Sequence, residues 1–326
     1  MVDLQEYVDS KQYCTLKVGG QFRYFAKAET AADVAELFRM SEEKHIQFFI
    51  LGGGSNIIFA DGVLDRLVVK IEIKGFDVVE ETDTYTDIRV GAGESWDEFV
   101  GKTVDMNLSG IEALSAIPGT VGATPVQNVG AYGQEVKDTI LLVDVFDSRD
   151  NTFKTLSNNE CGFLYRDSIF KGEAKSRYVI THVLFRLSKS TATIPQYPGV
   201  AEYFVQKGIA TPTLAEIREA ITSIRSKKLP NPNEVANVGS FFKNPIIDTA
   251  IALSLKDTYP TMPVFKANDT QSKISAGFLI EQAGLKGANF GTVSVYPHNA
   301  MVLVNNGGAT QADIESAQNQ IIQAVQ

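Results

Sequence analysis

Two glycine-rich segments contain the residues whose types and spacing could do chemistry. The first reads LGGGSN over residues 51–56 and follows the apolar run IQFFI. The second reads IPGTVGATPVQNVGAYG over residues 117–133, within a stretch that carries no charge from Ala113 to Gly133. Glycines let a large ligand approach the main chain closely, so that backbone N–H groups can meet its anionic oxygens. Two such loops on adjacent units predict a dinucleotide lying between them.

Neither segment matches a common nucleotide-binding fingerprint. A P-loop needs GxxxxGK[ST], and no Lys-Ser or Lys-Thr follows Gly54. A Rossmann fingerprint needs GxGxxG at the start of a helix, whereas the chain after Gly54 continues as SNIIFADG, which is typical of a strand. Ser55 and Asn56 add side-chain donors to the first loop. Taken alone, this loop is at least as compatible with a plain tight turn.

The composition excludes several classes of function. The formal net charge of −9 argues against a general nucleic-acid binder, because neutralising phosphates requires a basic surface. Two cysteines without a CxxC pair and three scattered histidines predict no disulfide framework, no metal site and no Ser-His-Asp triad. The acidic N-terminus and the lack of any run of about 18 apolar residues predict neither a signal peptide nor a membrane span. A cytoplasmic protein is expected.

Hydrophobic patterning predicts the elements that position the loops. A helix that Thr30 caps precedes the strand QFFIL and the first loop, and RLVVKIEI follows as another strand. TDIRVGAG then reads as a short strand, and a capping box of Ser95 and Glu98 opens a helix with Trp96 facing inward. ILLVDVF and YVITHVLFRL read as buried strands. This order is typical of a nucleotide-binding α/β or α+β unit.

The C-terminal third adds another helical and strand-forming unit. Capping boxes at Thr213 with Glu216 and at Thr310 with Asp313 open two helices, and SAGFLIEQAGLKG and AMVLVN read as a helix and a strand. The last helix reaches Gln326 without Gly, Pro or a basic last turn. From this we expect sequence beyond that residue.

Four motifs, LGGGSN, IPGTVGATPVQNVGAYG, GFLYRDSIFK and VGSFFKNP, follow one another in this order. With them the chain resembles the UDP-N-acetylenolpyruvoylglucosamine reductase family, in its longer subtype with a tyrosine loop, from about Thr15 to the C-terminus. The resemblance implies an α+β fold, with a two-subdomain FAD-binding module of the vanillyl-alcohol-oxidase (PCMH) type and a C-terminal α/β substrate-binding domain. The expected parts are residues 1–72, 73–210 and 211–326, with the last helix leading back toward the first subdomain.

The resemblance also implies the activity, which is NADPH-dependent reduction of UDP-N-acetylglucosamine enolpyruvate to UDP-N-acetylmuramate through FAD. This reaction belongs to peptidoglycan precursor synthesis, and thus to cell-wall biogenesis, cell shape and cell division. The implied cofactor is non-covalent FAD, because neither loop offers a histidine or cysteine to tether it, and NADPH is the co-substrate. The implied partners are small molecules, with no nucleic acid and no membrane, and the protein is expected to be a monomer.

The residues that would hold FAD are small or carry neutral hydrogen-bonding groups, and all lie in the two glycine loops. They are Gly52, Gly53, Gly54, Ser55, Asn56, Pro118, Gly119, Gly122, Ala123, Gln127, Asn128, Gly130 and Ala131.

Two residues match the family's catalytic positions. Arg166 would stabilise the enolate that forms on the substrate, with Tyr165 beside it as a substrate contact, because a guanidinium can grip a carboxylate with two hydrogen bonds. Considered without the family, Arg166 would instead pair with Asp167 or another acid. Ser240 would donate a proton to C2 of the enolpyruvyl group. From chemistry alone Ser240 would be read as a turn residue, and only the resemblance raises it above that reading.

The remaining matches concern the UDP-sugar. Lys228 would bind the diphosphate and Asn244 the nucleotide part, and Gln282 would lie near the active site. Tyr197 fits the mobile tyrosine of the longer subtype, with Tyr203 as a rival. Lys228 and Gln282 also have ordinary structural readings, as a solvated basic helix end and as a satisfied helix glutamine.

The chain departs from the family at its end. The family continues into a strand with a Leu-Glu-Pro-Glu motif whose glutamate assists at the reacting carbon, and no such motif follows GGATQADIESAQNQIIQAVQ. An alternative function is therefore a catalytically impaired FAD and UDP-sugar binding protein. A flavin oxidase of the same fold is a third possibility, against which SFFKNP and RSKKLP argue because they suit a UDP-sugar.

Overall fold

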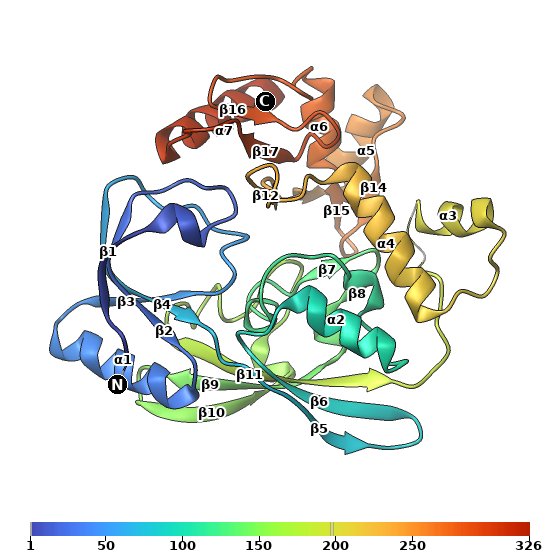
Figure 1. The fold of residues 1–326 in the computed structure, drawn as a ribbon. Helices are drawn as coiled ribbons and strands as arrows, with labels where there is room; N and C mark the ends of the chain where they lie inside the picture. Colours follow the sequence, from blue (N-terminus) through green and yellow to red (C-terminus); the bar gives the residue numbers. More distant parts are fainter. Residues whose placement is uncertain (1, 196, 198) are drawn as a thin grey trace. The chain divides into compact units, whose positions relative to one another are not determined.

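The computed structural model describes residues 2–195, 197 and 199–326, and the chain divides into two compact units. Unit 1 comprises Met1–Val8, Phe22–Gly54 and Val63–Arg225. Unit 2 comprises Asp9–Gln21, Ser55–Gly62 and Ser226–Gln326. This division is coarser than the predicted three parts and cuts the chain at other places than residues 72 and 210. The colours of Figure 1 follow the chain through both units.

The first sheet of unit 1 has the strand order β1-β2-β4-β3. Its members are β1 (Gln5–Asp9), β2 (Gln21–Ala28), β3 (Gln47–Leu51) and β4 (Val63–Ile71), and the helix α1 (Ala31–Glu43) joins β2 to β3. β3 and β4 are parallel, with Gln47 opposite Arg66. The predicted cap is confirmed, because Thr30 and Asp33 exchange both bonds of a capping box.

The second sheet of unit 1 is antiparallel throughout, with the order β10-β9-β11-β6-β5. Its strands are β5 (Phe76–Glu81), β6 (Tyr85–Gly91), β9 (Ile140–Asp147), β10 (Thr152–Ser157) and β11 (Tyr178–Ser188). The helix α2 (Trp96–Asp105) packs on one face of this sheet (Figure 1). The strands predicted from ILLVDVF and YVITHVLFRL are thus β9 and β11.

The capping box predicted at Ser95 is wrong. Ser95 is the N-cap of α2, but its side chain makes no capping hydrogen bond. The reason is that the second glycine loop pairs with this position. The N–H of Trp96 donates to the carbonyl of Gly119 at 3.1 Å, and Val121 donates to the carbonyl of Glu94 at 2.9 Å. The loop therefore pairs with the main chain on both sides of Ser95 and satisfies the N–H of Trp96, the first residue of the helix.

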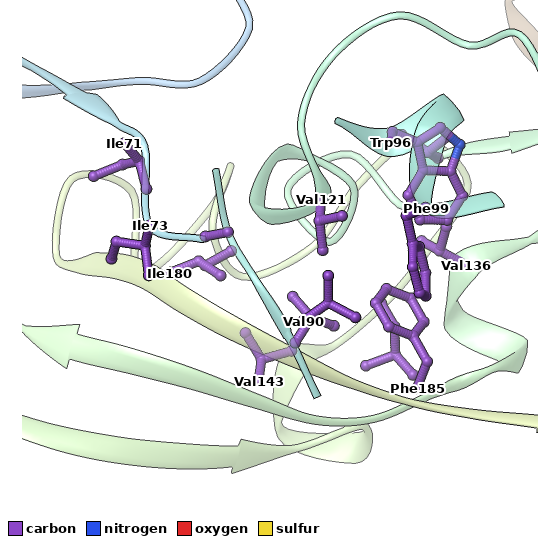
Figure 2. Close-up of a cluster of buried hydrophobic side chains, with 14 of the residues drawn as sticks. Ile71, Ile73, Val90, Trp96, Phe99, Val121, Val136, Val143, Ile180 and Phe185 are labelled. Carbon is purple, nitrogen blue, oxygen red and sulfur yellow. The ribbon is translucent and has the colours of Figure 1, made fainter. Parts of the chain in front are cut away.

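One continuous hydrophobic core serves both sheets of unit 1. Trp96, Phe99 and Phe185 lie together within it, with ring centroids 5.0 to 6.0 Å apart (Figure 2). The indole N–H of Trp96 donates to the carbonyl of Leu114 at 3.0 Å, so its buried polar group is satisfied. Val121, from the second glycine loop, points into the same cluster (Figure 2). The burial of Val121 thereby anchors the middle of the loop in the core. A fully buried apolar side chain contributes about 1.5–3 kcal/mol to stability.

Smaller elements complete unit 1. A hairpin of β7 (Gly130–Ala131) and β8 (Gln134–Glu135) begins within the end of the second glycine loop. The helices α3 (Val200–Lys207) and α4 (Leu214–Lys228) come later, with the last residues of α4 in unit 2. The capping box predicted for α4 is confirmed by the bonds between Thr213 and Glu216. Short 3-10 helices span Ser10–Tyr13, Glu112–Leu114, Val121–Ala123, Val136–Asp138 and Asn159–Cys161.

Unit 2 contains two three-stranded sheets, with the orders β12-β17-β16 and β13-β15-β14. The strands are β12 (Asn237–Ser240), β13 (Ile246–Asp248), β14 (Val264–Lys266), β15 (Gln271–Ile274), β16 (Val293–Val295) and β17 (Val302–Asn305). The helices are α5 (Thr249–Thr258), α6 (Ala276–Gln282) and α7 (Gln311–Val325). The predicted final helix and its capping box at Thr310 are confirmed.

An N-terminal segment belongs to the core of unit 2. Leu16 and Val18 are fully buried there, in a cluster with residues of α6, β16, β17 and α7. The Asn305 side chain donates to the carbonyl of Leu16 at 2.9 Å, and the N–H of Asn237 donates to the carbonyl of Thr15 at 3.1 Å.

Among the described residues, no helix is long and apolar enough to span a membrane.

Candidate functional site

The two glycine loops meet within unit 1. A Cβ placed on Gly53 would lie 2.9 Å from the Cα of Gly119, and one placed on Gly52 would lie 2.9 Å from the Oγ1 of Thr120. Side chains at these two positions would collide with the opposite loop, so glycine is needed for the approach. The structure thus brings together the two segments that the sequence predicted to share one ligand.

Two further glycines have a packing role that the sequence did not predict. A Cβ on Gly122 would lie 2.5 Å from the Cβ of Ala92, and the N–H of Gly122 donates to the carbonyl of Ala92 at 2.9 Å. Gly93 similarly has no room beside the main chain of Glu72. Gly122 thus lets the second loop lie directly on the chain that leaves β6, and Gly93 lets that chain lie directly on the residues that follow β4.

Unused backbone donors gather where the two loops meet. None of the described residues accepts a hydrogen bond from the N–H groups of Gly52, Gly53 and Gly54, or from those of Gly119 and Thr120. Adjacent N–H groups without protein acceptors form a site that suits an anionic group, such as the pyrophosphate of a dinucleotide. The residues present therefore fit FAD.

The other predicted members of this set lie along the same two segments. In the second loop Pro118 is exposed, whereas Ala123, Gln127 and Ala131 are half-buried. In the first segment Ser55 is half-buried and Asn56 is exposed. Their contacts with FAD stay predictions.

The side chain of Asn128, a residue of the second loop, makes several hydrogen bonds within the protein. It is fully buried, and its backbone is left-handed with φ of 42°. Its amide nitrogen donates to Glu135 and to the carbonyl of Leu164, both at 3.0 Å, and its Oδ1 accepts the N–H of Lys137 at 3.2 Å. Because the side chain is used within the protein, a contact between Asn128 and FAD would involve the main chain.

Arg166 is fixed against the main chain of the second loop. Its guanidinium donates to the carbonyl of Asn128 at 3.3 Å and to the carbonyl of Gly130, and it lies 3.7 Å from the carboxylate of Glu135. It also lies over the ring of Tyr165, 5.1 Å from the centroid. The acid nearest to Arg166 is thus Glu135 rather than Asp167, whose carboxylate accepts the N–H of Ser168. The structure thus places a cation at the predicted flavin loop.

The two rival tyrosines differ in their surroundings. Tyr197 is 41% exposed, and its ring meets that of Tyr132, in the GAYG end of the second loop, at 5.1 Å. Tyr203 is half-buried and packs into a cluster with residues of α3 and α4. A tyrosine that closes over a substrate must be free to move. Tyr197 therefore suits that role better than Tyr203.

A group of charged residues that the sequence did not predict lies at Ala116, the residue directly before the second loop. Asp97 of α2 pairs with Arg218 of α4 at 2.6 Å, and Arg225 of α4 donates to the carbonyl of Ala116 at 3.2 Å. Burial lowers the pKa of Arg225, and the neighbouring Tyr132 acts in the opposite direction. An acid in the first turn of a helix is usually read as a partner of the helix dipole, so the sequence held no signal for this contact.

In unit 2, Ser240 ends β12 directly after Gly239, which is left-handed with φ of 68°. The buried Asn237 accepts the N–H of Gly239 at 2.8 Å, and the N–H of Phe241 donates to the carbonyl of Met301 at 2.7 Å. The backbone is therefore held on both sides of Ser240, whose side chain is exposed.

The remaining predicted residues also lie in unit 2. Asn244 accepts the N–H of Ala276 at 3.0 Å and so serves the start of α6, while Gln282 is the exposed last residue of that helix. Lys228 is the exposed last residue of α4. The side-chain oxygen of Asn244 thus has a structural task, and the binding roles of all three stay predictions.

Comparison with known proteins covers both parts of the chain. A family described as FAD binding domain matches residues 22–157, and one described as UDP-N-acetylenolpyruvoylglucosamine reductase, C-terminal domain, matches residues 231–326. The UDP-N-acetylenolpyruvoylglucosamine reductase of Flavobacterium johnsoniae is 38% identical, over 99% of this chain and 96% of that protein. That of Neisseria meningitidis serogroup A is 41% identical, over 96% and 91%.

The fold agrees with a solved structure of the same kind. The UDP-N-acetylenolpyruvylglucosamine reductase of Thermus caldophilus superimposes with a TM-score of 0.71, over 99% of this chain and 96% of that one, at 22% sequence identity. The predicted fold class, an FAD-binding module followed by a reductase C-terminal domain, is confirmed. By sequence identity over nearly its whole length, this chain belongs to the UDP-N-acetylenolpyruvoylglucosamine reductase family.

Proposed function

We infer that this chain is an FAD-dependent reductase that uses NADPH to convert UDP-N-acetylglucosamine enolpyruvate to UDP-N-acetylmuramate in peptidoglycan synthesis. This inference rests on one observation. Two glycine loops contact each other, and hydrogen bonds hold the side chain of an arginine against the second of them. In unit 1, Gly53 abuts Gly119, and the Arg166 guanidinium is bonded to the main chain of the same second loop.

The two loops would hold FAD through their main chain. The N–H groups of Gly52, Gly53 and Gly54 would donate to the pyrophosphate, with those of Gly119 and Thr120 from the second loop. When bound, FAD supplies the hydride relay between NADPH and the substrate. The side chains of this protein need only bind, orient and protonate.

Arg166 would stabilise the negative charge that develops on the substrate. Addition of hydride at C3 of the enolpyruvyl group leaves charge at C2 and on the adjacent carboxylate. The guanidinium is already oriented by the carbonyls of Asn128 and Gly130, so little reorganisation is needed when that charge appears. Its remaining N–H donors can meet the carboxylate.

Ser240 would deliver the proton to C2. Its backbone is held by the bonds of Gly239 and Phe241, and its hydroxyl has no hydrogen-bond partner among the described residues. A serine hydroxyl is a weak acid. The carbon C2 becomes a strong base as negative charge develops on it, so it can take this proton, while Arg166 would stabilise that charge. Positioned proton transfer of this kind contributes about 10²–10⁴-fold to a rate.

Anaerobic mixing with NADPH tests this function. The purified protein is loaded with FAD, mixed with NADPH while the flavin absorbance is followed, and then given the enolpyruvyl UDP-sugar. Bleaching followed by recovery of colour is expected, and UDP-N-acetylglucosamine, which lacks the enolpyruvyl group, is the matched control and should restore no colour. A protein that takes up no FAD would overturn the proposal. Bleaching with no recovery would favour the catalytically impaired binding protein.

Two further properties are proposed with the function. We propose that the protein is cytoplasmic and a monomer, as its resemblance to the family implies. Light scattering of the FAD-loaded protein would test the monomer, and the mass of a dimer would contradict it. Cell fractionation would test the location.

A further inference from the structure

A carboxylate on α2 is hydrogen-bonded both to the residue directly before the second glycine loop and to α4. The Oδ1 of Asp97 accepts the N–H of Ala116 at 2.5 Å and the Nη1 of Arg218 at 2.6 Å, and the Oδ2 accepts the Nη2 of Arg218 at 3.1 Å. Such a pair of parallel bonds between a guanidinium and a carboxylate fixes direction as well as distance. Asp97 therefore joins three segments of unit 1 through one side chain.

The loop residue in this contact has a disfavoured backbone. Ala116 is left-handed with φ of 59°, a conformation in which its Cβ crowds the following carbonyl. No glycine or asparagine eases the position, and the residue directly precedes IPGT. A strained residue persists only where its surroundings determine it, and such residues gather at ligand-binding sites.

The carbonyl of Ala116 is held as well as its N–H. Arg225 donates to it from Nε at 3.2 Å. Arg218 and Arg225 lie about two turns apart on α4, so they project from the same face of the helix. Both polar groups of one strained residue are thus bonded to charged side chains, to Asp97 of α2 at the N–H and to Arg225 of α4 at the carbonyl.

Not every ion pair of unit 1 reaches a loop. Arg186 holds Asp87 with two bonds of 2.7 Å between neighbouring strands of the second sheet. That pair has the same chemistry as Arg218 with Asp97, but its residues lie within regular strands. The Asp97 pair differs in holding a strained residue three positions before Gly119.

We propose that Asp97 is a positioning residue for FAD, a role that rests on the proposed function. With Arg218 and Arg225 it keeps Ala116 left-handed, and this sets the direction in which residues 117–120 leave toward Gly53. The N–H groups of Gly119 and Thr120 then face the pyrophosphate. Because Arg218 and Arg225 lie on α4, the position of this helix also affects how tightly FAD is held.

The test measures FAD affinity separately from stability. Apoproteins of the wild type, Asp97→Ala and Asp97→Asn are titrated with FAD while flavin fluorescence is followed, and each apoprotein is melted. Asp97→Ala should weaken FAD binding about tenfold to a hundredfold, as loss of a charge-assisted hydrogen bond implies. Asp97→Asn keeps an acceptor for Ala116 and should be affected less. Asp87→Ala is the matched control, which should melt earlier yet bind FAD as the wild type does.

A second substitution tests the backbone argument itself. Glycine accepts a positive φ without strain, so adding Ala116→Gly to Asp97→Ala should recover part of the lost FAD affinity. Should Asp97→Ala fail to fold, Arg218→Gln replaces it, with a smaller expected loss because the Ala116 bond remains. Equal FAD affinity in wild type and Asp97→Ala, or no recovery with Ala116→Gly, would overturn the proposal. Failure of the wild type to bind FAD would instead overturn the proposed function.

Discussion

The two proposed catalytic residues are held in different ways. Arg166 has a left-handed backbone and a guanidinium that is bonded to the carbonyls of the second glycine loop. Ser240 has an ordinary strand position, and the left-handed residue is its neighbour Gly239. In Arg166 the side chain is fixed by hydrogen bonds, whereas in Ser240 only the main chain is fixed.

This difference follows from what each residue is proposed to do. A long side chain with many rotamers must be held before charge develops, because ordering it during the reaction costs free energy. A serine side chain has one heavy atom beyond Cβ, so fixing the backbone nearly fixes the hydroxyl. Substitutions that act on one of the two positions therefore separate orientation of a side chain from orientation of the main chain.

The largest effect is expected from Ser240→Ala. If Ser240 donates the proton, recovery of flavin colour with the enolpyruvyl UDP-sugar should slow by about 10²–10⁴-fold. Bleaching by NADPH should be unchanged, because no proton donor to C2 is needed there. The melting temperature should also be unchanged, since the side chain is exposed. Equal slowing of both half-reactions would remove Ser240 from this role.

Asn128→Ala should have the largest effect on stability. It removes three buried hydrogen bonds and leaves an alanine in a left-handed conformation, at a cost of about 3 kcal/mol in the free energy of unfolding. Asn151→Ala is the control, because Asn151 is also left-handed, with φ of 53°, but is exposed. Urea unfolding should give the control a loss of only about 1 kcal/mol. Similar losses for the two variants would show that the buried bonds contribute little.

Arg166→Lys tests whether the charge of this residue is sufficient. Lysine keeps the charge but lacks the planar fork that meets two carbonyls and a carboxylate, so the second half-reaction should slow about tenfold to a hundredfold. Arg89→Lys, in a pair with Asp144 on the second sheet, is the control and should leave both half-reactions unchanged. Rapid mixing measures these rates. A wild-type rate for Arg166→Lys would mean that orientation is unimportant.

The smallest effect is expected from Gly239→Ala. No atom lies within 4 Å of the added Cβ, so the cost is that of the left-handed backbone alone, about 1 kcal/mol of stability. Gly172→Ala, where φ is not positive and the nearest atom is 3.7 Å away, should cost almost nothing. If the backbone positions Ser240, Gly239→Ala should also slow the second half-reaction. An unchanged rate would separate Gly239 from catalysis.

The sequence predicted what is local in the fold. The capping boxes at Thr30, Thr213 and Thr310 depend on residues three positions apart, and the structure has all three. The box predicted at Ser95 failed because a distant loop pairs with that position. The partners of Leu16 and Val18 were also not predicted, since a short apolar pattern does not reveal what it packs against.

The candidate site divides in the same way. The glycine loops were recognised from composition and spacing, and Arg166 and Ser240 came from the family resemblance. The buried bonds of Asn128 and the contact of Asp97 with Ala116 were not foreseen, because residue types alone do not show that Asn128 and Ala116 have a left-handed backbone. Backbone strain of this kind is visible only in a structure.

The burial of Leu16 and Val18 in unit 2 has a consequence for synthesis on the ribosome. Their partners in α6, β16, β17 and α7 are synthesised much later, and the hydrogen bond from Asn305 to Leu16 spans 289 positions. The nascent chain must therefore leave these two apolar side chains without their native partners until those later segments have emerged. Contacts of such sequence separation form late and slowly. In this protein, the segment around Leu16 and Val18 is therefore expected to become native late, although it is synthesised early.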